Sequence, residues 1–113
     1  MGELSSVGTA WIALILAGIF EIGWPVGLKI AQAGSYRIWG ILLAVITMAG
    51  SGLFLWFAQK TIPMGTAYAV WTGIGAAGTF ILGLILYGEP YSLLRIFGVL
   101  LIISGVVVLK LAH

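Results

Sequence analysis

Long apolar runs separated by short polar breaks extend along the whole chain. The runs predict four membrane-spanning helices, at about residues 9–32, 38–59, 66–87 and 93–111. Each run is close to the roughly 20 residues that cross a bilayer as a helix, and the breaks hold the glycine, proline and single charges typical of interfacial turns. No stretch alternates at the length of a barrel strand, so the pattern predicts an all-α membrane protein.

The composition places nearly all of the chain in the lipid bilayer. Of its 113 residues, 62% are hydrophobic and 7% are charged, whereas about a quarter of the residues of a soluble domain are charged. Four spans use roughly 80 positions and leave no room for a soluble domain. We therefore expect a single four-helix transmembrane domain over residues 1–113.

Several classes of function lack the residues they need. The chain has no cysteine and a single histidine, His113, so we expect neither a metal site nor a cofactor. The five basic residues are scattered singly and form no patch for nucleic acid. One acid inside the membrane without an internal histidine cannot supply general acid and base groups, so an enzyme is not expected.

Glu21 is the one carboxylate deep inside a predicted span. Such a group costs several kcal/mol unless it is protonated, paired or open to a water-filled cavity, and it is therefore a candidate functional residue. The structural alternative is that Glu21 only hydrogen-bonds a neighbouring helix.

The helix face of Glu21 also carries Gly18, Trp24, Pro25 and Leu28. Gly18, one turn before the acid, is expected to leave open space beside the carboxylate. Trp24, one turn after it, brings an indole N–H and an aromatic face within reach, although tryptophan also serves as an interface anchor. Pro25 removes the backbone hydrogen bond to the Glu21 carbonyl, which predicts either a kink or a local adjustment of the helix.

Polar residues of two other spans are candidates to complete the site. Tyr68 and Trp71 share a helix face, and their O–H and N–H groups need partners, for which Glu21 is the natural candidate. Ser51 is placed at mid-depth, where it donates either to the same carboxylate or back to its own helix.

Two glycine pairs indicate close approaches or bends. Gly73 and Gly75 allow either a bend of the third span or the packing of another helix against it. Gly98 and Gly105 are seven residues apart and fall on one face of the fourth span, where small residues permit close helix contact.

The basic residues give only a weak preference for one orientation in the membrane. Lys60 and Lys110 are expected at one surface, and Lys29, Arg37 and Arg95 at the other, a difference of two against three. Insertion in one orientation and insertion in both orientations therefore stay open. Insertion both ways would allow an antiparallel dimer, whose second copy would help to shield the buried acid from lipid.

A carboxylate surrounded by aromatic side chains suits an organic cation. The same group can hold either a proton or the cation. Competition between the two suffices for exchange transport when the site opens to each side in turn. The sequence therefore predicts proton-coupled exchange of a cation.

The sequences AGIFEIGW, which contains Glu21, and IPMGTAYAVWTGIG, residues 62–75, resemble the small multidrug resistance family, and within it the guanidinium exporters. The resemblance covers essentially the whole chain. It implies a dual-topology, antiparallel homodimer in the plasma (inner) membrane of a prokaryote, which exchanges protons for guanidinium or small guanidinyl cations by alternating access.

The resemblance also implies roles for single residues, and Pro25 departs from it because a small residue such as alanine is expected there. Glu21 from both copies binds the substrate and the proton in one site. The polar ring that orients the acid is implied to consist of Trp24, Ser51 and Tyr68. Trp71 is implied to be the binding-site aromatic residue, and Gly98 and Gly105 are implied to form the dimer contact.

Guanidinium also suits the site on chemical grounds, since its N–H donors match a carboxylate in pairs and its plane stacks on aromatic rings. Three alternatives stay open. One is a broad exporter of quaternary ammonium compounds, one is a membrane subunit that does not transport, and one is an obligate hetero-oligomer.

Overall fold

The computed structural model describes residues 2–112, with side chains from residue 6 on, and His113 lies outside this range. Within it the chain forms four helices and no strand: α1 (Gly2–Gln32), α2 (Arg37–Ala58), α3 (Met64–Tyr87) and α4 (Leu93–Ala112). Each of the four is long and apolar enough to cross a membrane, so the predicted fold class is confirmed. Helix α1 begins at Gly2, well before residue 9, and its segment Ser6–Gln32 is apolar enough to span a membrane.

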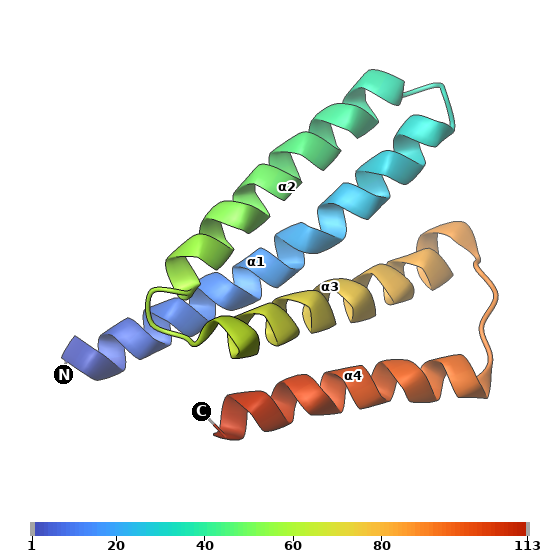
Figure 1. The fold of residues 1–113 in the computed structure, drawn as a ribbon. Coiled ribbons are helices and arrows are strands. Elements are labelled where there is room, and N and C mark those ends of the chain that lie inside the picture. Colours follow the sequence, from blue (N-terminus) through green and yellow to red (C-terminus); the bar gives the residue numbers. More distant parts are fainter. Residues whose placement is uncertain (1, 113) are drawn as a thin grey trace.

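Successive helices run in opposite directions (Figure 1). The α1–α2 turn passes through Gly34 with φ of 91°, and the α3–α4 connection begins at Gly88 with φ of 57°, a conformation that glycine adopts without steric cost. Pro63 precedes α3 as its N-cap and cannot extend α2. The chain termini and the α2–α3 turn therefore lie at one end of the molecule, and the other two turns lie at the opposite end (Figure 1).

Helices α1 and α2 approach until their backbones touch. A Cβ atom added at Gly27 would lie 2.6 Å from the carbonyl oxygen of Gly40, and one added at Gly40 would lie 2.5 Å from the backbone nitrogen of Ala31. Close approach of this kind is the usual means of helix association in lipid, where no hydrophobic force draws helices together. The two glycines fix the α1–α2 hairpin at the end near its turn.

The buried core lies at the other end of the hairpin, where α1, α2 and α3 converge. Leu14, Ile62 and Val70 are at most 1% exposed there, with Ala58 of α2 beside them. From this core α3 diverges from the hairpin (Figure 1). Two grooves lie between α1 and α3.

Helix α4 packs against α3 and buries none of its residues. Its outward side chains are large and apolar, with Leu93 87% exposed and Leu111 81% exposed. Such a surface suits lipid or another apolar helix, and a soluble protein rarely exposes one of this extent.

Gly40→Ala is expected to destabilise the protein because its methyl group would meet the backbone of α1. Overpacking of this kind costs about 1–3 kcal/mol. In the same helix Gly52 has no heavy atom within 4 Å of an added Cβ, so Gly52→Ala should keep or raise stability through its better helix propensity. Detergent unfolding followed by circular dichroism measures both changes, and equal effects would contradict the close contact.

Candidate functional site

Glu21 lies in the middle of α1 and is hydrogen-bonded by a neighbour on its own helix. The Trp24 indole donates from Nε1 to Glu21 Oε1 at 2.7 Å. Helix geometry brings these two side chains together, since residues three apart lie on one face. An ionised carboxylate has about four acceptor positions, so one N–H fixes its orientation and leaves acceptor capacity for a further donor.

Helices α1 and α3 interlock around the acid. A Cβ at Gly75 of α3 would lie 2.7 Å from Glu21 Cγ, and one at Gly18 of α1 would lie 2.7 Å from Ile74 Cβ. Each glycine therefore receives a side chain of the other helix. The expectation that Gly18 leaves open space beside the carboxylate is wrong, because Ile74 fills that space. Gly75 provides the room for the acid instead.

Ser51 and Trp71 form a separate network that does not reach the carboxylate. The Ser51 hydroxyl donates to the Ala17 carbonyl oxygen at 2.7 Å, and the Trp71 indole donates to Ser51 Oγ at 2.7 Å. The predicted bonds from these residues to Glu21 are thus not present, and Ser51 does not bond back to its own helix. A fully buried hydroxyl needs a partner, and Ser51, 1% exposed, finds one on each neighbouring helix.

This network links three helices next to the acid. Ala17 belongs to α1, Ser51 to α2 and Trp71 to α3. In an α-helix the carbonyl of residue 17 also faces the backbone N–H of residue 21. The network therefore holds the turn of α1 on which Glu21 sits.

Tyr68 lies outside the immediate surroundings of Glu21. Its ring is 5.4 Å from that of Trp71 between centroids, at an interplanar angle of 56°, and the residue is 55% exposed. The predicted bond from Tyr68 to Glu21 is not present in this chain. Its exposed side is open to a group that comes from outside the chain.

A groove of about 340 Å³ opens beside the Glu21 carboxylate, between α1 and α3. From α1 it is lined by Glu21, Trp24 and Pro25, and from α3 by Thr72, Gly75, Ala76 and Thr79. This volume is at the lower end of the range for small-ligand sites. The groove is therefore suited to a small cation that reaches the acid from the side of α3.

The sequence does not single out three of these groove residues, Thr72, Ala76 and Thr79. Together with Gly75 they fall at intervals of three and four residues, which places small and weakly polar side chains on one face of α3. That stripe of small residues was the available signal, since a carboxylate in a helix interface needs small residues opposite it.

The other candidate glycines, Gly73, Gly98 and Gly105, differ in how closely another helix approaches them. An added Cβ at Gly73 would lie 2.6 Å from Val106 Cγ2 of α4, so Gly73 and Gly75 admit side chains of two different helices. For Gly98 and Gly105 no heavy atom of the described chain lies within 4 Å of an added Cβ. Helix α1 runs through Pro25 to Gln32 as one helix, which agrees with local adjustment around the proline.

Among the described residues no group of three or more histidine, aspartate or glutamate side chains is close enough to hold a metal ion. The chemistry available in the groove is that of one carboxylate, an indole and two threonines. These groups can bind and release a cation or a proton.

Comparisons with known proteins show the family of the chain. Residues 9–102 match the family described as Small Multidrug Resistance protein. A guanidinium exporter of Yersinia pseudotuberculosis serotype I (strain IP32953) is 50% identical over 103 residues, which cover 91% of this chain and 98% of that protein. The guanidinium exporter of Escherichia coli (strain K12) is 44% identical over 91% of this chain and 97% of its own length.

The guanidinium exporter of Salmonella typhimurium (strain LT2) is likewise 44% identical, again over 91% of this chain. Transporters of this kind are thus similar to the chain over nearly its full length. With four spanning helices and an acid in the first of them, this chain is a multi-pass membrane protein that belongs to the small multidrug resistance family.

Proposed function

We propose that this protein exports guanidinium or small guanidinyl cations from a prokaryotic cell across its plasma (inner) membrane, in exchange for protons. The functional unit is an antiparallel homodimer of oppositely inserted chains. Glu21 of each copy contributes to one site, which opens to the two sides of the membrane in turn. The substrate is carried unchanged, so the protein is a transporter and not an enzyme.

The hydrogen bond from Trp24 to Glu21 is the observation that carries the choice of substrate. It holds the carboxylate in one orientation and leaves acceptor positions for paired N–H donors. Guanidinium is planar and supplies such pairs, whereas a quaternary ammonium has no N–H to donate. The names of the relatives, which are guanidinium exporters, support the same substrate.

Exchange with protons follows from the use of one acid for both ligands. A proton on Glu21 removes the negative charge that holds the cation, and a bound cation occupies the oxygens that a proton would take. The two ligands therefore exclude each other at each carboxylate. Coupled exchange needs no second titrating group, provided that the site is open to one side at a time.

The unpartnered surfaces of the chain support the dimer. Helix α4 buries no residue of its own, and a Cβ added at its glycines, Gly98 or Gly105, would meet no atom of another described helix within 4 Å. Small residues on an exposed helix face allow a second helix to approach closely. The exposed side of Tyr68 likewise leaves this residue available to the site of a paired copy.

Glu21→Gln is expected to abolish proton-coupled guanidinium transport, because an amide neither titrates nor carries charge. Transport currents in proteoliposomes should fall to the level of protein-free vesicles. Glu3→Gln is the matched control, since Glu3 precedes the apolar run that starts at about residue 9, and it should leave the currents unchanged. Undiminished currents with Glu21→Gln would instead favour a structural role for the acid.

Trp24→Phe keeps an aromatic ring but removes the N–H that orients Glu21. A hydrogen bond to a charged group contributes about 1.5–3 kcal/mol, so guanidinium affinity should fall by roughly tenfold or more. Tetramethylammonium needs no directional bond, and its weak binding should change less. Transport currents of wild type and Trp24→Phe, measured with each cation, test this difference in affinity. A wild-type protein that carries tetramethylammonium strongly and guanidinium not at all would exclude the proposed substrate.

Gly105→Leu is expected to weaken the dimer because a large side chain on this face of α4 keeps a second helix away. Val107 lies on the opposite face and is 50% exposed, so Val107→Leu is the matched control and should dimerise normally. Cross-linking in detergent, with the chain expressed alone, measures the dimer fraction. A chain that neither dimerises nor transports on its own would indicate an obligate hetero-oligomer.

A further inference from the structure

A second, smaller cleft of about 160 Å³ lies between the ends of α1 and α3. Pro25 and Thr79 line both this cleft and the groove beside Glu21, so the two spaces are neighbours with a common wall. Its lining residues Lys29, Tyr87 and Glu89 are at or just beyond the ends of α1 and α3, and these ends lie at the end of the molecule that holds the α1–α2 and α3–α4 turns (Figure 1). The cleft is therefore placed on a route between water and Glu21.

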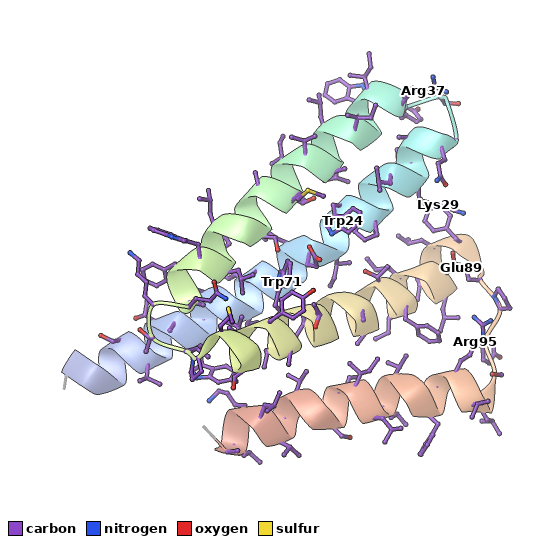
Figure 2. The ribbon with its side chains drawn as sticks, in the orientation of Figure 1. Trp24, Lys29, Arg37, Trp71, Glu89 and Arg95 are labelled. Carbon is purple, nitrogen blue, oxygen red and sulfur yellow. The ribbon has the colours of Figure 1, made fainter. Side chains whose placement is uncertain are left out.

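The cleft holds one charge of each sign, Lys29 from α1 and Glu89 from the segment after α3. Figure 2 shows both at the same end of the molecule. The backbone of Glu89 is held by a hydrogen bond from its N–H to the Gly83 carbonyl, at 3.2 Å. A Cβ at Gly83 would collide with the Glu89 carboxylate, so this glycine lets the acid lie against α3.

Two sources of negative potential thus meet at this position. The Glu89 carboxylate provides one, and the C-terminal end of α3, which ends at Tyr87, provides the other through its unpaired carbonyls. A carboxylate at a helix C-terminus is unfavourable for the helix and favourable for a cation that binds there. The arrangement attracts a positive group.

Lys29 already places a positive group in the cleft. Its Nζ lies 5.6 Å from the centroid of the Tyr87 ring, within the range of a cation–π contact. A carboxylate together with an aromatic face is the same chemistry that surrounds Glu21, where the ring is that of Trp24. The ammonium therefore occupies a place that a small organic cation would fit.

We infer that this cleft is an outer site for the transported cation, in which Lys29 acts as a tethered competitor. The arriving guanidinium displaces the ammonium from the Tyr87 ring, pairs with Glu89 and then passes Pro25 and Thr79 to Glu21. The long side chain of Lys29 can swing into the headgroup region, as lysines at helix ends commonly do. This inference rests on the proposed function.

The test compares two charge-neutralising variants in proteoliposome currents at varied guanidinium concentration. Glu89→Gln should raise KM roughly threefold, and Lys29→Gln should lower it by a similar factor, as expected for partly solvated contacts. Turnover at saturation should change less than twofold in both. Lys29→Arg keeps a cation on the ring and should retain the wild-type KM.

Lys60→Gln is the matched control for Lys29→Gln. Lys60 also contacts a ring, with Nζ 4.2 Å from the Trp56 centroid, but its own groove shares no residue with the one beside Glu21. The Lys60→Gln variant should keep the wild-type KM for guanidinium. An equal fall in KM with both lysine variants would overturn the inference, because it would indicate a general effect of surface charge.

Unchanged KM values for Lys29→Gln and Glu89→Gln in a protein that still transports guanidinium would also overturn the outer site, while leaving the proposed function intact. Absence of guanidinium currents from the wild-type protein would overturn both. If the thermal melt shows that Glu89→Gln does not fold, the outer site is tested by comparing Lys29→Gln with Lys29→Arg. A KM for guanidinium that falls in Lys29→Gln but not in Lys29→Arg supports the site, and equal KM values contradict it.

Discussion

The hydrogen bond between Trp24 and Glu21 satisfies the most demanding requirement of this sequence, a carboxylate in the middle of an apolar helix. In lipid a polar group without a partner costs several kcal/mol. Here the partner comes from the next turn of the same helix, and Gly75 of α3 admits the side chain. The acid is thus held in place without being enclosed, and one side of it stays open to the groove.

The polar groups near the middle of the chain divide into two networks with different uses. The bond from Ser51 to Ala17 is buried and the bond from Trp71 to Ser51 is part-buried. Together they use the hydroxyl and indole donors to hold three helices together. The Trp24–Glu21 pair retains free acceptor positions. Because Ala17 lies one turn before Glu21, the first network positions the helix turn from which the second one works.

The four helices and the choice of Glu21 as the candidate functional residue follow from the sequence because both depend on local properties. Apolar length determines a span, and a lone acid within a span is conspicuous. The pairing of Trp24 with Glu21 follows from helical spacing alone. The neighbours of Gly18 and Ser51 do not, because they depend on how α1, α2 and α3 rotate against one another, and no local pattern determines that rotation.

The depth of each charged group decides what an antiparallel pair can share. Opposite insertion relates two copies by an axis in the membrane plane, so only residues at mid-depth return to the same depth in the second copy. Glu21 lies near the middle of the span predicted at about residues 9–32, and two copies of it can therefore enter one site. Lys29 lies in the last turn of α1, and Glu89 follows the end of α3. A pair would carry one such cleft at each membrane surface, which gives a central site with an equivalent approach from either side.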